Sequence, residues 1–176
     1  MPRIIALSGL AQAGKSTVAS FLEEIGFIRV RFAGPLKGML RSLGLTNRHI
    51  EGDLKEVPCD LLCGKTPRWV MQRLGTEFGR DMVGEDLWTN AWTESVLAAL
   101  DQGAQGVVAE DCRFINEVAA VQRLGGQLWR VERLDLVPGE HISERALLGI
   151  TPAITILNHA TLDRLRAATL GALQQC

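Results

Sequence analysis

Glycine, lysine and hydroxyl side chains near the start of the chain have the spacing of a phosphate-binding loop. Gly9, Gly14, Lys15 and Ser16 match the pattern G-x-x-x-x-G-K-S/T, and they follow the apolar run Ile4–Leu7, which is typical of a buried strand. In such a loop the backbone N–H groups point at phosphate oxygens, and the helix that begins there adds partial positive charge. The motif therefore predicts binding of a nucleoside triphosphate.

The polar residues of this loop have separate expected tasks. Lys15 has the charge and the reach to contact the β- and γ-phosphates, and the hydroxyl of Ser16 is a ligand for Mg²⁺. We therefore expect the nucleotide to bind together with Mg²⁺. The residues expected to hold the nucleotide in the loop are Gly9, Ala13, Gly14, Lys15, Ser16 and Thr17.

A second group of chemically useful residues follows the apolar segment Gly106–Ala109. Asp111 comes at the end of this expected strand, where an acid can orient Mg²⁺ and its waters; capping of the next helix is the alternative role. Arg113 follows two residues later and has the position to bridge the phosphates of two nucleotides. Lys15, Asp111, Arg113 and Arg133 are the expected catalytic residues, and solubility of the surface is the alternative for any one arginine.

Further arginines surround a loop that has the composition of a lid. Arg130, Arg133 and Arg145 flank Pro138 and Gly139, and we expect the lid to cover about residues 132–152. A lid of this kind can bring an arginine to the group that is transferred.

A third informative stretch begins at Thr66, which together with Pro67 is typical of a helix N-terminus. We expect this helix to run through about Asp81 and, at 100° per residue, to have one apolar face. Two glycines interrupt it at a cost of about 1 kcal/mol each relative to alanine, so a close neighbour is expected. The expected apolar face is Met71, Leu74, Phe78 and Met82, and the strip beside it is Arg68, Gln72, Gly75 and Gly79.

Two explanations of that strip stay open. A neighbouring helix can pack closely against the glycines, or a nucleotide can lie beside Arg68 and Gln72, whose side chains offer donors to a phosphate and a base.

Composition limits the class of protein. A chain of 176 residues suits one domain, and a formal net charge of −1 does not favour bulk binding of nucleic acid. No apolar run approaches the roughly 18 residues that span a membrane, and no signal peptide is visible. The four cysteines lack the paired spacing of a zinc site, so we expect free thiols in a reducing cytoplasm.

Strands and helices alternate along the chain. This order predicts an α/β fold with a parallel sheet covered on both faces and with ligands at the carboxyl ends of its strands. The segment from Leu45 to Lys65 has little periodicity and is interpreted as a mobile excursion. Strands are expected at Ile4–Leu7, Gly26–Phe32, Gly106–Asp111, Gln127–Val131 and Ile154–Leu157, and further helices from Pro35 and over Leu87–Leu100, Asn116–Leu124 and Leu162–Leu173.

The order of five sequence blocks closely resembles that of the bacteriophage deoxynucleoside monophosphate kinases, over about Ile4 to Leu165. Besides the loop, the blocks are F-A-G-P-L-K (Phe32–Lys37), T-P-R-x-x-x-Q-R-L-G-T-E-F-G-R (Thr66–Arg80), E-D-x-R-F-x-N-E (Glu110–Glu117) and H-x-S-E (His141–Glu144). Two positions depart from that family's pattern: Glu110 replaces an aspartate, and Asn158-His159-Ala160 replaces Asn-Asp-Gly.

The resemblance implies an adenylate-kinase-like P-loop NTPase fold with a parallel five-stranded sheet flanked by helices, a helical acceptor-binding segment and a lid loop. It implies a single kinase domain over residues 1–176, with an acceptor-binding insertion at about 34–104. The implied reaction is transfer of the γ-phosphoryl group of ATP to a deoxynucleoside 5′-monophosphate, with Mg²⁺. The implied acceptor-binding residues are Lys37, Arg68, Gln72, Arg73, Glu77 and Arg80, and Asn158 is implied to lie beside the donor adenine.

Other classes of protein share the phosphate-binding loop. Small GTPases are disfavoured because the guanine-recognition string N-K-x-D does not occur. A dephospho-CoA kinase has a similar loop, a phage kinase that acts on modified bases in DNA is a second alternative, and a non-catalytic nucleotide sensor is a third. We expect nucleotides as partners, no stable binding of nucleic acid, no membrane, a monomer or homodimer, and a cytoplasmic protein, in the host cytoplasm if a phage encodes it.

Overall fold

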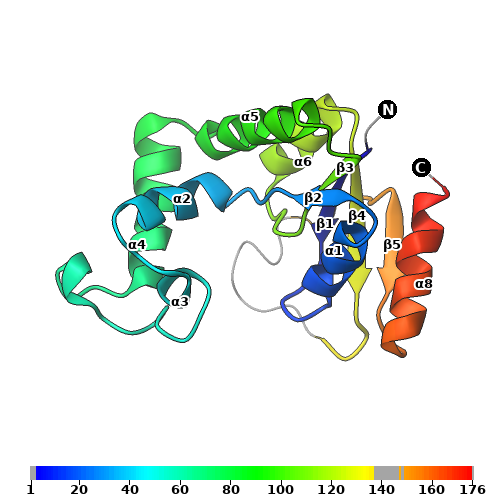
Figure 1. Ribbon diagram of the computed structural model, residues 1–176, viewed down its shortest axis with the longest axis horizontal. Helices are drawn as coiled ribbons and strands as arrows, with labels where there is room; N and C mark the ends of the chain where they lie inside the picture. The colour runs from blue at the N-terminus through cyan, green and yellow to red at the C-terminus, as the bar shows by residue number, and fades with distance from the viewer. Residues whose placement is uncertain (1–2, 137–146, 148, 176) are drawn as a thin grey trace. The chain divides into compact units, whose positions relative to one another are not determined.

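The structure is a computed structural model that describes residues 3–136, 147 and 149–175 (Figure 1). Contacts within the chain divide it into two compact units. We name Met1–Arg31 with Thr93–Cys176 the sheet unit and Phe32–Trp92 the helical unit. The single kinase domain and the acceptor-binding insertion at about 34–104 stay predictions. Most of the predicted lid lies outside the described residues, as do Arg145, His141 and Glu144.

Five parallel strands form the sheet, in the order β2-β3-β1-β4-β5. β1 and β3 are nearly continuous apolar runs that are buried, as expected for interior strands of a parallel sheet. The predicted α/β class is therefore confirmed. The strands are β1 (Arg3–Ser8), β2 (Phe27–Arg29), β3 (Gly106–Ala109), β4 (Gln127–Glu132) and β5 (Ile154–Leu157).

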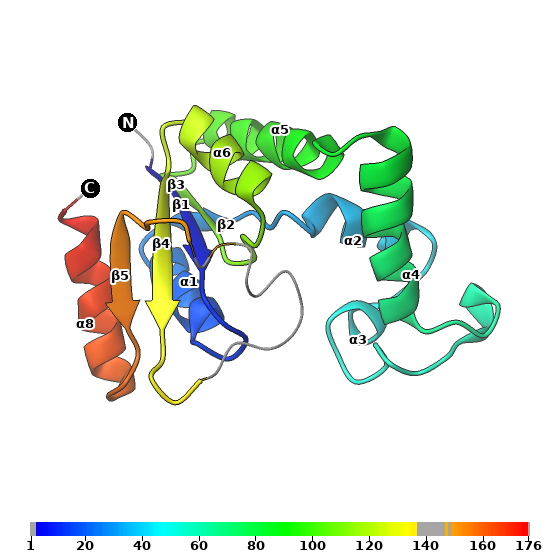
Figure 2. The same cartoon turned by 180° about the vertical axis from the view of Figure 1, so that it is seen from behind.

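Helices cover both faces of this sheet (Figures 1 and 2). Side chains alternate along a strand, so Ile5 and Leu7 of β1 point to one face. There they join an apolar cluster with residues of α1 (Lys15–Glu23) and α8 (Leu162–Leu173), which lie side by side. α6 (Ile115–Arg123) packs on β1 and β4 from the face to which Ile4 points. Because the strands are parallel, their carboxyl ends lie on the same side of the sheet, and the loops that follow them meet there.

The helical unit is built from short helices around its own apolar core. Leu36, Leu40, Leu45, Ile50 and Trp88 are the buried members of that core. No helix among the described residues is long and apolar enough to cross a membrane. The elements are α2 (Gly34–Ser42), α3 (Asn47–Ile50), the 3₁₀-helix η1 (Asp60–Leu62), α4 (Pro67–Arg73) and the π-helix η2 (Leu74–Val83); α5 (Leu87–Asp101) begins here and continues into the sheet unit.

The prediction of a mobile excursion from Leu45 to Lys65 is wrong. The segment contains α3 and η1, and it buries Leu45 and Ile50. Its second half is closed by backbone hydrogen bonds, in which the Cys59 N–H donates to the Lys65 carbonyl at 3.2 Å. Helices of about one turn are too short to produce a hydrophobic period, which explains why the sequence pattern does not show them.

The helix predicted from Thr66 begins as expected and then changes its winding. Thr66 Oγ1 accepts the Trp69 N–H at 3.1 Å, which confirms the predicted N-terminal cap. From Leu74 onward the backbone bonds of η2 join residues five apart, so the turn holds more than four residues. The spacing of 100° per residue no longer applies, and the predicted apolar face is wrong in this part. Phe78 is 39% exposed and Met82 is 77% exposed.

Two neighbouring side chains explain the glycines of this helix. A Cβ on Gly75 would lie 3.2 Å from Cδ1 of Leu36. The indole Nε1–H of Trp88 donates to the Gly75 carbonyl at 2.8 Å. A Cβ on Gly79 would lie only 2.5 Å from Cε2 of the same indole. Packing of neighbouring side chains therefore accounts for the glycines without a bound nucleotide. Arg68 and Gln72 stay predicted binding residues on their chemistry and on the family resemblance alone.

Candidate functional site

The predicted phosphate-binding loop lies at the carboxyl end of β1, between that strand and α1. Gly9 and Gly14 have positive φ angles of 135° and 104°, in the region that favours glycine. A Cβ on Gly14 would lie 2.5 Å from Asn158 Nδ2, and a Cβ on Gly9 would collide with the Val131 carbonyl. Both glycines are therefore required by the loop's conformation and by the close approach of β4 and of the β5 end.

Lys15 is folded over this loop. Its Nζ donates to the carbonyl oxygens of Gly9 and Leu10, each at 2.7 Å. Its ammonium group therefore lies on the concave side of the loop, where phosphate oxygens would be placed.

Asn158 fixes the loop from the neighbouring strand. Its Nδ2 donates to the Ala13 carbonyl at 2.9 Å, and its backbone N–H donates to the Glu132 carbonyl at 2.7 Å. The resemblance placed Asn158 beside the donor adenine. The observed contacts make it a brace that connects the end of β5, the end of β4 and the loop.

A cavity of about 330 Å³ lies against this loop. Four of its lining side chains carry positive charge, Glu132 carries the negative charge, and Leu134, Leu136 and Leu147 form an apolar part. Such a lining suits a ligand with several anionic groups and an apolar portion. The cationic side chains are Lys15, Arg113, Arg130 and Arg133.

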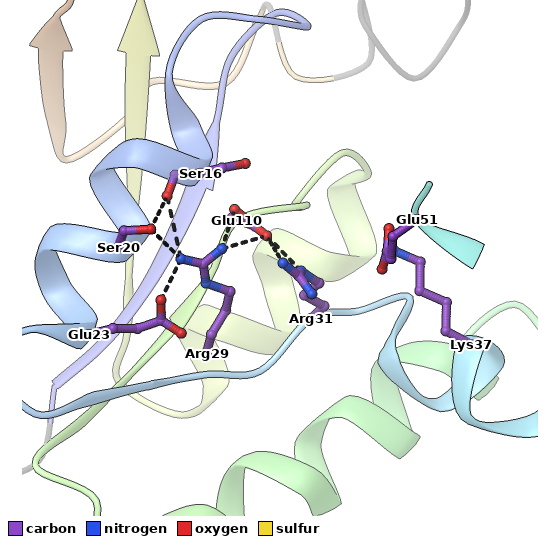
Figure 3. A network of polar contacts seen from close by, with 8 residues as sticks. All are labelled: Ser16, Ser20, Glu23, Arg29, Arg31, Lys37, Glu51 and Glu110. Atoms are coloured by element: carbon purple, nitrogen blue, oxygen red, sulfur yellow. Dashed lines mark hydrogen bonds and ion pairs between the residues drawn. The ribbon is translucent and has the colours of Figure 1, made fainter. Parts of the chain in front are cut away.

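Beside the start of α1, a buried carboxylate connects three elements (Figure 3). Glu110, directly after β3, is 7% exposed. Arg29 Nη1 donates to both of its carboxylate oxygens at 3.1 Å, and Arg31 Nε donates to Oε1 at 2.6 Å. Arg29 also reaches helix α1, where it donates to Ser20 Oγ at 2.9 Å and pairs with Glu23 at 2.5 Å.

The electrostatics of Glu110 follow from these contacts. Burial alone would raise the pKa of Glu110, but hydrogen bonds from Ser16 and Arg31 and the charges of Arg29 and Arg31 outweigh it, so the pKa lies below its usual range. The carboxylate is therefore charged at neutral pH and lies next to the loop serine. In the sequence, Glu110 stands out only as a departure from a family pattern, and no local pattern marks Arg29 as a functional residue.

The donor groups near Ser16 fit a magnesium ion that arrives with a nucleotide. Mg²⁺ prefers oxygen ligands and is usually held by one or two carboxylates together with substrate phosphates. Ser16, Glu110 and the half-buried Asp111 supply a hydroxyl and two carboxylates in this region. The described residues contain no group of three or more His, Cys, Asp or Glu side chains that would hold an ion without a nucleotide.

The turn that carries Arg113 is held by the helix that follows it. The buried Glu117 accepts the backbone N–H groups of Arg113 and Phe114, at 2.6 and 3.0 Å. This contact fixes the backbone of Arg113, while its side chain is exposed and reaches the cavity.

Burial, with the charges of Glu117 and Asp111, raises the pKa of the Cys112 thiol well above its usual value, so this cysteine is not a nucleophile at neutral pH.

The two lid arginines in the described part of the chain differ in their contacts. Arg130 donates to the carbonyl oxygens of Leu147 and Ile150, at 2.7 and 2.6 Å, and so anchors the C-terminal end of the predicted lid. Arg133 pairs with Asp135 through two hydrogen bonds at 2.8 and 3.0 Å, and its side chain is 43% exposed. Arg133 is thus the more easily rearranged of the two.

The predicted acceptor-binding residues all belong to the helical unit. Lys37 pairs with Glu51 at 2.7 Å, and Arg68 pairs with Glu56. Arg73 pairs with Glu77, and its guanidinium group lies 5.3 Å from the ring centre of Trp69. The side chains of Gln72, Arg73 and Glu77 are exposed, and that of Arg80 is half-buried. The structure thus gives two separate clusters, one formed by Lys37 and Arg68 with their acids and one on the outer face of α4 and η2.

Comparisons with known proteins agree with the sequence resemblance. Residues 64–168 match the deoxynucleotide monophosphate kinase family. A protein of Acanthamoeba polyphaga mimivirus that carries the provisional name of a deoxynucleotide monophosphate kinase is 32% identical over 176 residues, which cover 91% of this chain and 90% of that protein.

Solved structures show the same fold at low identity. An APS kinase of Mycobacterium tuberculosis is 12% identical with a TM-score of 0.54, over 98% of this chain and 97% of that one. The dephospho-CoA kinase of Campylobacter jejuni is 13% identical with a TM-score of 0.51, over 99% and 97% of the two chains. These similarities establish a P-loop kinase fold. Because the family match covers residues 64–168 and the viral relative extends it over nearly the whole chain, the protein belongs to the deoxynucleotide monophosphate kinase family and is a phosphotransferase.

Proposed function

We propose that the chain transfers the γ-phosphoryl group of ATP to a deoxynucleoside 5′-monophosphate, and that Mg²⁺ accompanies the donor. The observation that carries the donor half is the cationic cavity at the phosphate-binding loop. Negative charge spreads over the migrating phosphoryl group, so catalysis requires positioning and cationic stabilisation more than covalent chemistry. Lys15, Arg113 and Arg133 supply that charge in our proposal, and Gly14 with Ser16 and Thr17 supplies the start of the helix that faces the phosphates.

Two carboxylates are candidates for the magnesium-binding acid. Mg²⁺ would neutralise phosphate oxygens of the donor, and Ser16 with Asp111 was the expected protein contribution. Glu110 competes with Asp111 for this role because it is charged and hydrogen-bonded to Ser16. Separate Glu110→Gln and Asp111→Asn variants decide between them: the variant at the metal-orienting acid raises the Mg²⁺ concentration needed for half-maximal activity, and the other does not.

The acceptor half is proposed for the helical unit. Lys37 and Arg68 are cations whose present partners are glutamates, and a phosphate can replace a carboxylate in such a pair. Gln72 offers both a donor and an acceptor to a base edge. Arg73, Glu77 and Arg80 remain proposed contacts from the family resemblance, with Arg73 and Glu77 acting as the pair that they form on the helix surface.

One assay tests the proposal against its alternatives. ADP release is measured with ATP and Mg²⁺ in the presence of each deoxynucleoside monophosphate, each ribonucleoside monophosphate, dephospho-CoA or DNA. We expect turnover with at least one deoxynucleoside monophosphate, and a specificity constant roughly tenfold or more above that of its ribo counterpart, because a site without a partner for the 2′-hydroxyl leaves a buried polar group unsatisfied. Turnover with dephospho-CoA or DNA alone would refute the proposal, and equal constants for deoxy and ribo substrates would refute the selectivity.

A further inference from the structure

Lys55 has a setting that none of the assigned roles explains. The chain's lysines are Lys15, Lys37, Lys55 and Lys65. Lys15 belongs to the phosphate-binding loop, and Lys65 is exposed with its amine 5.3 Å from the ring centre of Trp69. Lys37 has a carboxylate partner. Lys55 lies in the segment between α3 and η1, where the sequence pattern gave no sign of a site.

The surroundings of Lys55 form one cluster of charges within the helical unit. Lys37 Nζ pairs with Glu51 at 2.7 Å, and Figure 3 shows these two side chains. Arg68 pairs with Glu56. Lys55 comes between the two glutamates in the chain, and its carbonyl accepts the Arg68 N–H at 3.0 Å. The backbone of Lys55 is thereby fixed at the start of α4, next to the side chain of Arg68.

Among the described residues, the amine of Lys55 differs from those of its neighbours in having no carboxylate of its own. In the part of the chain that the structure describes, both nearby glutamates are occupied by Lys37 and Arg68. The Lys55 side chain is half-buried. Burial and then the charges of Arg68 and Lys37 lower the pKa of Lys55, and Glu51 and Glu56 only partly oppose this effect. Three cations therefore share two carboxylates, so a further anion would be stabilised here.

We propose that Lys55 binds the 5′-phosphate of the acceptor nucleotide together with Lys37 and Arg68. This inference rests on the proposed function, because it names a contact for the acceptor in the helical unit. A phosphate monoester brings close to two negative charges and several acceptor oxygens, which suits a lysine ammonium and the fork of an arginine. Glu51 and Glu56 are exposed, so a phosphate can reach the cations that they hold. Both partners of the Arg68–Glu56 pair are exposed, so this pair contributes little to stability and is easily exchanged for the phosphate.

Kinetics of Lys55→Met test this contact. Loss of a hydrogen bond to a charged group is expected to raise KM for the deoxynucleoside monophosphate roughly tenfold or more, while KM for ATP and the melting temperature stay at the parent values. Because the contact is to the phosphate, the factor should be the same for every monophosphate that is accepted. Lys65→Met is the matched control, with the same change on the same unit, and should alter neither KM. Lys55→Arg retains the charge and should recover most of the affinity.

Calorimetric titration of the monophosphate into parent and variant separates the possible failures. A Lys55→Met protein that binds the monophosphate within about threefold of the parent overturns the inference and leaves the proposed function intact. An equal rise of KM for ATP and monophosphate overturns it as well, because Lys55 would then support the fold only. A parent chain that neither binds nor phosphorylates any deoxynucleoside monophosphate refutes the proposed function and the inference together.

Discussion

Two arginine–glutamate pairs of the molecule are made of the same groups in opposite settings. In the sheet unit, the side chains of Arg29 and Glu110 are 14% and 8% exposed. In the helical unit, those of Arg68 and Glu56 are 49% and 61% exposed. A buried pair fixes geometry, because removal of one partner leaves a charge without water or a counter-ion. An exposed pair is screened and contributes little, so it can be exchanged for a ligand.

This difference agrees with what each region has to do in the proposed reaction. Arg29 connects β2, the end of β3 and helix α1, so the loop that would hold the donor is fixed before a nucleotide binds. Lys37, Arg68 and Arg73 of the proposed acceptor site each pair with an exposed glutamate, which a nucleotide could replace. In these two pairs, burial separates an ion pair that holds the fold from one that is open to exchange with a ligand.

Lys15→Ala is expected to have the largest effect. The variant should fold and lose at least about 10³-fold in kinase activity, because several kcal/mol of charge stabilisation on the transferred group are removed. ADP release at saturating substrates and the melting temperature are the two measurements. Activity within about tenfold of the parent would contradict the role of the loop in holding the donor. The buried pair beside the loop would then not serve to fix a donor site.

Arg29→Gln against Arg68→Gln tests the comparison directly. Arg29→Gln should lower the free energy of unfolding by roughly 3 kcal/mol, because Glu110 keeps only Arg31 as a charged partner in a buried place. Arg68→Gln should change it by less than about 1 kcal/mol. Denaturant titration of both variants measures the difference. Similar losses in the two would mean that burial does not separate the two kinds of pair.

Gly79→Ala and Gly38→Ala sharpen the interpretation of the acceptor helix. A Cβ on Gly79 meets the indole of Trp88, so this change should destabilise the protein by about 1–3 kcal/mol. Gly38, within α2, has no atom within 4 Å of an added Cβ, and its change should stabilise by up to about 1 kcal/mol. Thermal unfolding of both variants gives the signs. A stable Gly79→Ala protein with weakened monophosphate binding would instead favour the alternative that a nucleotide approaches this glycine.

Arg68→Ala and Glu56→Gln act on the exchangeable pair and should have the smallest effects. Arg68→Ala is expected to raise KM for the monophosphate about tenfold with little change for ATP. Glu56→Gln releases Arg68 from its present partner and should lower the same KM by a few-fold at most. Initial rates with either substrate varied give both constants. Equal changes for ATP and monophosphate would make this helix a structural element.

Regular elements of the fold could be predicted because their signals are local. The helix expected over Leu162–Leu173 has those bounds in the structure, where Thr161 caps it by accepting the Arg164 N–H. The positions of the five strands could be predicted because each strand has a short pattern of apolar residues, which can be recognised without knowing its neighbours in the fold. β2 ends at Arg29, before its predicted end, because Phe32 already packs in the helical unit, where its ring stacks on Trp92 at 4.3 Å.

The parts that could not be predicted depend on contacts between distant residues. Arg29 and Glu110 are 81 positions apart, and no local spacing relates them. Trp88 comes from the next helix and donates to the Gly75 carbonyl within the π-helix, a contact across 13 positions that no local pattern shows. Lys55 lies among residues without periodicity, and its neighbours Lys37 and Arg68 become neighbours only when the helical unit is folded. The phosphate-binding loop of Gly9–Thr17 could be predicted from the sequence because one contiguous stretch contains all the residues of its motif.

The hydrogen bonds of Lys15 to Gly9 and Leu10 have a consequence for competition among cellular anions. An anion that binds in the loop meets an ammonium group that already donates to two carbonyl oxygens at 2.7 Å. A triphosphate would offer this ammonium its β- and γ-phosphates within a single molecule, whereas inorganic phosphate or sulfate would offer one anionic group. We therefore expect inorganic phosphate and sulfate to compete only weakly with the donor.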